Sequence, residues 1–382
     1  MKRYEYYEFF AGGGMVRAAL DQDRWICKFA NDFDRKKSEY YKLNWHPENL
    51  HTKDVRAVQL HELSGCADLA WASFPCQDLS LAGGGAGLKG ERSGTYWPFW
   101  RIMEGLIKDG RGPKIIALEN VCGTLTSHGG KDFSEICNNF RKNDYQFGAI
   151  VIDAAKFVPQ SRPRLFVIGI HSDITLPDFF RGNQFNDLHT RSLVKAHSRL
   201  SRAIQSSWIW WTLPAPPKRE LNFVDVIEEE PTGVQWHSPE DTQKLISMMS
   251  DVHIAKLNSA KRWKKLKIGA LYKRTRIENG IKTQRAEIRF DDIAGCLRTP
   301  AGGSSRQVIF VVKSQNVKSR LLSTRETARL MGLADDYIMP DNYNEGYHLT
   351  GDGVAVPVVK FLSEHIFEPI LRINSSIERA AA

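Results

Sequence analysis

The stretch YEYYEFFAGGGMVRAAL, residues 4–20, joins a strand-like apolar run to a helical pattern through three consecutive glycines. Glycine lets the backbone turn tightly and approach a ligand closely. A dinucleotide-binding fingerprint would place its third glycine at position 17, which is Arg17, so a nicotinamide or flavin enzyme is disfavoured. The stretch predicts the first strand and helix of an α/β fold. A plain turn at the start of a helix would look the same, so the glycines alone do not establish a site.

The alternation of strand and helix patterns continues from this stretch to about residue 175. The expected strands cover residues 4–10, 25–30, 68–73, 114–118, 147–152 and 165–170. The expected helices cover residues 15–20, 35–43, 95–108 and 133–142. Such alternation predicts a mainly parallel sheet with helices on both faces.

The bulk composition narrows the class of protein. The 382 residues include 53 Lys and Arg against 44 Asp and Glu, and the net charge of +9 favours an anionic partner. No apolar run approaches the roughly 20 residues that span a membrane, and the N-terminus lacks the apolar core of a signal peptide. The six cysteines have no metal-ligand spacing and are too few for a disulfide framework. We therefore expect a cytoplasmic protein with free thiols, no membrane segment and no metal site.

The pattern changes after residue 178. Residues 178–222 are polar and irregular, and their tryptophans (Trp208, Trp210 and Trp211) are interpreted as packing anchors, although one could touch a base. Near the C-terminus, residues 354–370 predict a strand or turn followed by a helix that needs the N-terminal sheet as its partner. Residues after Arg372 are expected to be frayed.

A strongly basic segment covers residues 256–289. It contains twelve basic and two acidic residues, so its net charge is +10. A charge run is usually a solvated face. Here aromatic and apolar side chains are interleaved with the charges, which suits a groove that follows a phosphate backbone. These side chains are Trp263, Leu266, Leu271 and Tyr272.

Unusual residues follow several of the expected strands, and ligands of open α/β sheets bind outside the carboxyl ends of their strands. Asp32 ends the second strand, twenty residues after Gly12, where a carboxylate can bind ribose hydroxyls, and Asp54 follows later. Glu119 comes directly after the apolar strand at 114–118 and is a candidate proton donor. The alternative readings are surface acids for the two aspartates and a helix N-cap for Glu119.

Cys76 lies at the base of the glycine-rich stretch FPCQDLSLAGGGAGLKGERSG, residues 74–94. Most cysteines behave as small buried hydrophobes. A thiol beside a loop that can open and close is instead accessible, as a nucleophile must be. A zinc deaminase is rejected, because its second cysteine would fall at Leu79.

Six motifs resemble, in order, those of the cytosine-C5 DNA methyltransferases. They are FAGGG at 10–14, FPCQ at 74–77, ENV at 119–121, QSRPR at 160–164, STRETARLMG at 323–332 and GDGVAVPV at 351–358. The resemblance implies a Rossmann-like, S-adenosylmethionine-dependent methyltransferase sheet in a catalytic domain of residues 1–175 and 346–382. Residues 176–345 would form a smaller target-recognition domain and hinge, and about 171–290 carry no shared motif.

The resemblance also implies roles for single residues. Cys76 would add to C6 of a flipped-out cytosine, Glu119 would hold its N3, and Arg164, supported by Arg162, would contact the base and its phosphate. The implied cofactor-binding residues are Phe10, Ala11, Gly12, Gly14, Asp32, Phe33, Asp54, Val55, Pro75, Asp352 and Val354. The implied base-pocket residues are Phe74, Gln77, Ser80, Asn120, Val121 and Gln160. The glycine loop at 78–94 would close over the base.

One residue departs from the family pattern. Asp352 stands where many members have asparagine, and an acid there could repel the carboxylate of the cofactor or face away and cap a turn. The expected partners are double-stranded DNA and a cognate restriction endonuclease, and the expected state is a monomer. The nearest rival is a tRNA cytosine methyltransferase, whose Cys-Phe-Thr tripeptide is missing here. A non-catalytic DNA-binding relative should have lost Cys76 or Glu119, and both are present.

Overall fold

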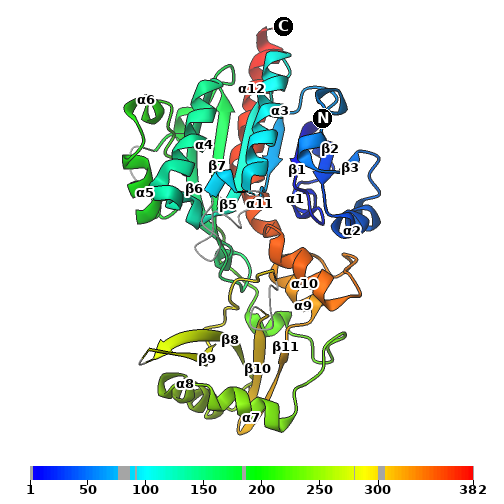
Figure 1. Ribbon diagram of the computed structural model, residues 1–382. Helices are drawn as coiled ribbons and strands as arrows, with labels where there is room; N and C mark the ends of the chain where they lie inside the picture. The colour runs from blue at the N-terminus through cyan, green and yellow to red at the C-terminus, as the bar shows by residue number, and fades with distance from the viewer. Residues whose placement is uncertain are drawn as a thin grey trace. The chain divides into compact units, whose positions relative to one another are not determined.

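The computed structural model describes residues 3–75, 87–90, 93–182, 186–278, 280–299 and 306–381. The chain divides into two compact units (Figure 1). The first unit comprises Met1–Asp153, Pro163–Pro216 and Val358–Ala382, and the second comprises Ala154–Arg162 and Pro217–Pro357. Among the described residues, no helix is both long and apolar enough to cross a membrane.

The first unit is built on a seven-stranded sheet with the order β3-β2-β1-β4-β5-β7-β6. Its strands are β1 (Tyr4–Phe9), β2 (Trp25–Asp32), β3 (Leu50–Thr52), β4 (Leu69–Ala72), β5 (Ile115–Val121), β6 (Tyr145–Asp153) and β7 (Pro163–His171). β1 to β5 are mutually parallel, whereas β7 runs antiparallel to both β5 and β6. The expectation of a mainly parallel α/β sheet is confirmed.

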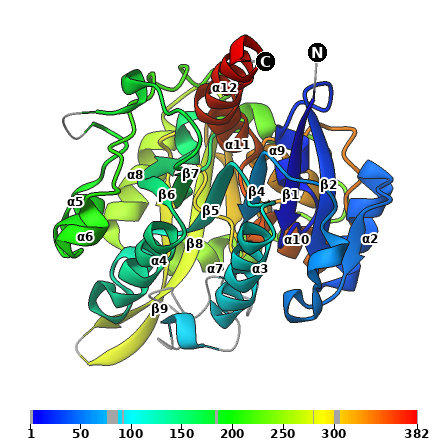
Figure 2. The same cartoon turned by 90° about the horizontal axis from the view of Figure 1, so that it is seen from above.

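Helices cover both faces of this sheet (Figure 2). They are α1 (Met15–Ala19), α2 (Arg35–Trp45), α3 (Tyr96–Lys108), α4 (Lys131–Lys142), α5 (Arg191–Ser198), α6 (Arg202–Gln205) and α12 (Glu368–Ala381). On one face, the ring centroids of Phe99 in α3 and Phe9 in β1 are 5.0 Å apart. On the other, Phe367 contacts Trp71 of β4 with their ring centroids 6.4 Å apart. Apolar residues at helical spacing on α3 form the stripe that the sheet buries.

The C-terminal segment forms the expected turn and helix and differs from its prediction only in its last residues. The apolar run around Pro357 begins helix α11 (Val356–Leu362) and forms no strand, because proline is tolerated in the first turn of a helix. α12 then continues to Ala381, so the expected fraying after Arg372 is wrong. The side chain of Asn374 explains the order: its Nδ2 donates to the Thr175 carbonyl at 2.9 Å and its Oδ1 accepts from the Thr175 N–H at 2.8 Å.

The second unit contains a four-stranded antiparallel sheet with the order β11-β10-β8-β9. Its strands are β8 (Lys267–Glu278), β9 (Ile281–Arg289), β10 (Val308–Lys313) and β11 (Asn316–Leu321). Its helices are α7 (Pro239–Ser247), α8 (Asp251–Lys261), α9 (Thr324–Leu330) and α10 (Tyr343–Asp352). Side chains from α7, α8 and the sheet share one apolar core.

The expected groove residues of the basic segment divide into two pairs. Leu271 is fully buried in the core of the second unit, and the Tyr272 hydroxyl donates to the Cys296 carbonyl at 3.1 Å and to Gln307 Oε1. Leu271 therefore faces the core and the Tyr272 hydroxyl is bonded within the unit, so the expectation that these two side chains line a groove is wrong. Trp263 and Leu266, which precede the strand, are exposed.

The tryptophan-rich segment belongs to the first unit, which extends to Pro216. Trp208 and Trp211 are buried there, and Trp208 packs against Phe147 of β6 with ring centroids 5.6 Å apart. Their interpretation as packing anchors is therefore confirmed. Compactness assigns no function to residues 176–216 or 346–357, so the expected division into catalytic and target-recognition domains stays a prediction.

Candidate active site

The carboxyl end of β5 carries a buried ion pair. Glu119 is 6% exposed, and its Oε1 lies 3.1 Å from Nε of Arg164. The pair forms because β7 runs antiparallel to β5, which places Arg164 opposite Val121. The first residues of β7 thus lie at the same edge of the sheet as the last residues of the parallel strands. Glu119 and Asn120 are part of β5 itself, whereas the sequence predicted a strand that ends at 118.

Asn120 ties the end of β5 to the end of β4. Its Nδ2 donates to the Phe74 carbonyl at 3.1 Å, and its Oδ1 accepts from the Val121 N–H at 2.8 Å and from the Thr124 hydroxyl at 3.2 Å. These donors and acceptors fix which end of the amide faces Phe74. The backbone two residues before Cys76 is thereby held against the strand that carries Glu119.

Phe74 is itself anchored, because its ring is buried against Tyr96 of α3 with centroids 5.2 Å apart. Cys76, Gln77 and Ser80 lie outside the described residues, as does most of the expected closing loop at 78–94. The structure therefore brings together Phe74, Asn120, Val121, Glu119 and Arg164 among the expected base-site residues.

The glycine turn after β1 has an unusual backbone. Phe10, Gly12 and Gly14 all have positive φ, at 58°, 55° and 79°. A Cβ on Gly14 would lie 2.3 Å from Nε1 of Trp45, so glycine is required there. Among the described residues, no heavy atom lies within 4 Å of the position that a Cβ on Gly12 would take. A left-handed phenylalanine is strained, and such strain clusters at ligand sites.

Asp32, at the end of β2, is hydrogen-bonded to this turn. Its Oδ2 accepts from the Gly12 N–H and its Oδ1 from the Asp34 N–H, both at 2.8 Å. Burial raises the pKa of Asp32, although Lys37 and the two backbone N–H groups oppose the shift. A carboxylate has about four acceptor positions, so it can accept further hydroxyl donors.

The other expected cofactor residues of the first unit lie at adjacent strand ends. Phe33 follows Asp32 and is 70% exposed, which is unusual for so large an apolar ring. Asp54 lies two residues after Thr52, the β3 partner of Asp32, and accepts from the Arg56 N–H at 2.8 Å. Val55 is buried in the core behind it. The structure thus gathers Gly12, Asp32 and Phe33 at the edge formed by β1 and β2.

The expected residues of the second unit are mostly bound to its backbone. Arg162 is buried, and its guanidinium donates to the carbonyls of Leu297, Gly351 and Gly353 at 2.9, 2.9 and 2.5 Å. Gln160 is fully buried as well, and it donates to the Leu330 carbonyl at 2.7 Å and accepts from the Leu297 N–H at 3.1 Å. These contacts describe a brace within the second unit.

Two more expected residues lie beside that brace. Asp352, the last residue of α10, accepts a hydrogen bond from the Thr299 hydroxyl at 2.9 Å. Val354 is buried. The roles expected for Gln160, Arg162, Asp352 and Val354 toward base and cofactor stay predictions.

Glu8 is not among the residues that the motifs point to. It is the penultimate residue of β1 and is fully buried, and the Tyr41 hydroxyl donates to its Oε2 at 3.0 Å. Burial raises the pKa of Glu8 to about 8, against opposing contributions from Tyr41 and Arg17. The signal in the sequence was an acid inside the apolar strand YEYYEF, two residues before the strained Phe10.

Comparisons with known proteins identify the family. The family model described as C-5 cytosine-specific DNA methylase matches residues 4–368. Type II methyltransferase M.BsuFI of Bacillus subtilis is 25% identical over 367 residues, which cover 96% of this chain and 73% of that protein. Type II methyltransferase M.HhaI of Haemophilus parahaemolyticus is 25% identical over 366 residues, which cover 94% of this chain and 93% of that protein.

Solved structures share the fold. The crystal structure of S. pombe Dnmt2 methyltransferase superposes with a TM-score of 0.60 at 17% identity, over 97% of this chain and 99% of that chain. The Entamoeba histolytica methyltransferase EhMeth gives a TM-score of 0.61 at 18% identity, with the same coverage of both chains, 97% and 99%.

Proposed function

The chain belongs to the C-5 cytosine-specific DNA methylase family and is a DNA cytosine-5-methyltransferase. We propose that it acts on one specific DNA sequence and that the reaction passes through a covalent bond between Cys76 and C6 of cytosine. The observation that carries the proposal is the Glu119–Arg164 pair, beside the Asn120 contact that holds the chain next to Cys76.

The proposed chemistry follows from the weak nucleophilicity of cytosine C5. Addition of the Cys76 thiolate to C6 breaks the C5–C6 double bond and turns C5 into an enamine carbon that can accept a methyl group. Loss of the C5 proton and expulsion of the thiolate then restore the aromatic ring. The target base must first leave the duplex, at a cost of about a few kcal/mol.

We assign Glu119 to the cytosine N3. Arg164 binds one oxygen of Glu119 and fixes the carboxyl plane, so that the other oxygen can share a proton with N3, which accepts it through its lone pair. The proton shared with N3 stabilises the negative charge that the ring gains when the thiolate adds, which makes C6 a better electrophile. Arg162, whose guanidinium holds three backbone carbonyls, would then be a positioning residue without contact to the base.

The half-buried Cys122 is the alternative nucleophile closest to Glu119 in the sequence. Burial raises the pKa of its thiol, although the charge of Arg164 opposes the shift. A raised pKa leaves less thiolate at neutral pH, so Cys122 is the weaker candidate.

The cofactor that we propose is S-adenosylmethionine, and the residues of the first unit fit it. The open space beside the Gly12 backbone admits a ligand, Asp32 can accept ribose hydroxyls, and the exposed Phe33 ring can cover the adenine. Asp54 would accept from the adenine amine. Phe10, Ala11, Gly14, Val55, Pro75, Asp352 and Val354 complete the proposed set. S-adenosylmethionine supplies an electrophilic methyl group on a sulfonium.

The partners remain proposals that rest on relatives. The curated relatives are named Type II methyltransferases, which supports a cognate restriction endonuclease as a partner of this chain. We propose duplex DNA as the substrate, residues 176–345 as the region that recognises its sequence, and a monomer as the active form.

The test is methylation sequencing at single-base resolution of plasmid DNA from cells that express the protein. We expect one recurring modified site with the wild type and none with Cys76→Ala. Cys66→Ala is the matched control, because Cys66 precedes β4 as Cys76 follows it, and Cys66 is exposed. Methylation that survives Cys76→Ala but not Cys122→Ala would refute the assigned nucleophile. Soluble wild-type protein without any modified DNA cytosine would refute the DNA substrate and lead to RNA.

A further inference from the structure

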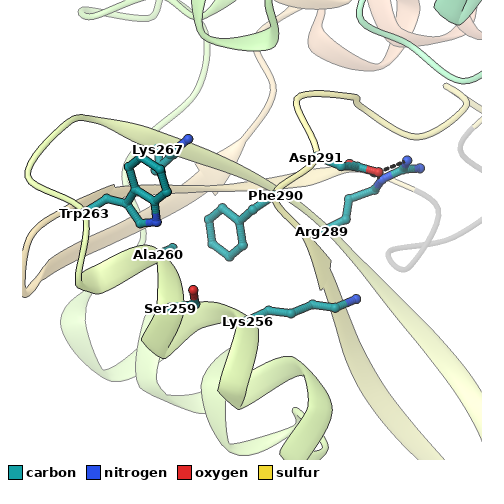
Figure 3. Close-up of a pocket in the computed structure, with 8 residues that line it drawn as sticks. All are labelled: Lys256, Ser259, Ala260, Trp263, Lys267, Arg289, Phe290 and Asp291. Carbon is teal, nitrogen blue, oxygen red and sulfur yellow. Dashed lines mark hydrogen bonds and ion pairs between the residues drawn. The ribbon is translucent and has the colours of Figure 1, made fainter.

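A recess in the second unit combines exposed aromatic rings with positive charge. It lies between the end of α8, the start of β8 and the end of β9, and its volume is about 370 Å³ (Figure 3). That volume is within the range of pockets that hold small organic ligands. We call it the α8 recess; its lining residues lie in the segment proposed to recognise the DNA sequence, and none of them is among the residues assigned to catalysis or to the cofactor.

Two rings line the recess. Trp263 is 55% exposed, and the ammonium of Lys267 lies 4.5 Å from its ring centroid. Figure 3 shows the half-buried Phe290 ring between the Trp263 indole and the side chains of Lys256 and Arg289. A tryptophan with more than half of its surface exposed to solvent offers a large apolar contact to a ligand with a flat face.

The charges of the recess sum to a positive value. Three cations and one anion line it, Lys256, Lys267, Arg289 and Asp291, which leaves a net charge of +2. Arg289 donates from Nε to Oδ1 of Asp291 at 2.6 Å and from Nη2 to Oδ2. Burial alone would raise the pKa of Asp291, but the contacts with Arg289 and the charge of Lys256 lower it.

Because Asp291 and Arg289 neutralise each other, Lys256 and Lys267 set the sign of the recess. One of them projects from α8 and the other from the start of β8. A ligand that satisfies both lysines and both rings must carry an anionic group next to a flat aromatic one.

We propose that the α8 recess binds an unpaired nucleotide of single-stranded nucleic acid, with the base on Trp263 and Phe290 and the phosphate at Lys256 and Lys267. The aromatic faces select against duplex DNA as the ligand, because paired bases are stacked and hide their faces. Base–aromatic stacking is the means by which proteins hold single strands without reading their sequence. The recess lies in the segment proposed to recognise duplex DNA, but binding of a single strand there goes beyond that proposed function and does not require methyl transfer.

The test measures binding of fluorescein-labelled oligothymidylate to the full chain by fluorescence anisotropy. Trp263→Leu keeps an apolar side chain but removes the stacking face, and we expect affinity to fall about tenfold. Trp236→Leu is the matched control, because Trp236 is 39% exposed in the same unit and lies near a cation, Arg320, at 5.0 Å. We expect the control to bind as the wild type does.

A second variant tests the phosphate contact. Lys256→Gln should reduce the slope of log affinity against log salt concentration by the amount of about one phosphate contact, while the apolar contact remains. Lys256 is exposed, so this variant should fold normally. Oligouridylate in a parallel titration distinguishes RNA from DNA as the source of the strand, and binding of either one supports the site.

Three results would overturn the proposal. The first is equal affinity of Trp263→Leu and wild type for the oligothymidylate. The second is a loss of affinity of Trp263→Leu for a blunt duplex that equals its loss for the single strand. The third is full competition by polyglutamate, which would indicate an anion site for acidic protein segments. None of them affects the plasmid methylation result, so failure of this site and failure of the methyltransferase assignment are distinguishable.

Discussion

Replacing Asn120 should separate the folding role of its amide from its role in catalysis. Asn120 is buried and takes part in three hydrogen bonds, to Phe74, Val121 and Thr124. Each is worth about 1 kcal/mol net, so Asn120→Ala should lower the free energy of unfolding by about 2–3 kcal/mol. For a unit of this size that corresponds to a fall in Tm of about 4–12 °C.

Asn120→Asp is the sharper variant, because it is nearly isosteric. It keeps an acceptor for the Val121 N–H and the Thr124 hydroxyl but loses the donor to the Phe74 carbonyl. We expect a loss of stability of at least about 2–3 kcal/mol, because the carbonyl is left without its donor and a carboxylate is placed in a buried site next to Glu119. The end of β4 should then be less well fixed, and the methyl-transfer rate should fall more than the affinity for DNA.

The assay is single-turnover methylation of a duplex that carries the identified site, at a temperature well below the Tm of each variant. Thermal unfolding is measured on the same preparations. An Asn120→Asp variant with wild-type Tm and a wild-type single-turnover rate would refute the reasoning, because the Phe74 contact would then support neither the fold nor the chemistry.

Three further predictions concern stability. Gly14→Ala should cost more than about 2 kcal/mol in urea unfolding, since its Cβ would meet the Trp45 indole at a positive φ; unchanged stability would contradict the turn geometry. Glu8 has a folded pKa of about 8, above its unfolded value, so the folded chain retains a proton that the unfolded chain loses. Stability should therefore fall as pH rises from about 4.5 through about 8, and Glu8→Gln should raise Tm more at pH 8 than at pH 5. The Arg320–Glu326 pair is fully buried, with Nη2 and Oε1 2.6 Å apart, so Glu326→Ala should cost about 3–5 kcal/mol in urea unfolding, and the double replacement by methionine should cost less.

The local pattern of the sequence predicted most of the first unit. Apolar runs and helical spacing located every strand of its sheet except the three-residue β3. The carboxyl-edge rule then placed Asp32 and Glu119 correctly at the edge of one sheet, because it depends on the direction of the parallel strands alone.

What could not be predicted depends on pairing between distant segments. The direction of β7 is not encoded in its own apolar pattern, so the ion pair between Arg164 and Glu119 was not expected. A continuous apolar run fits a strand and a buried helix equally well, which is why the sequence left open whether a strand or a turn precedes the helix near Pro357. The carbonyls that bind Arg162 come from residues more than a hundred positions away, and no motif spacing contains that information.

The short segment Ala154–Arg162 has a consequence for protein engineering. It belongs to the second unit, yet it connects β6 to β7 of the first. A chimera that imports only residues 217–357 from a relative would therefore leave Gln160 and Arg162 behind in the host chain. The graft would have to present its own carbonyls where Leu297, Leu330, Gly351 and Gly353 present theirs. Exchange of the second unit between such enzymes is thus a transplant in two pieces, and the nine-residue piece is the one that a single pair of crossover points omits.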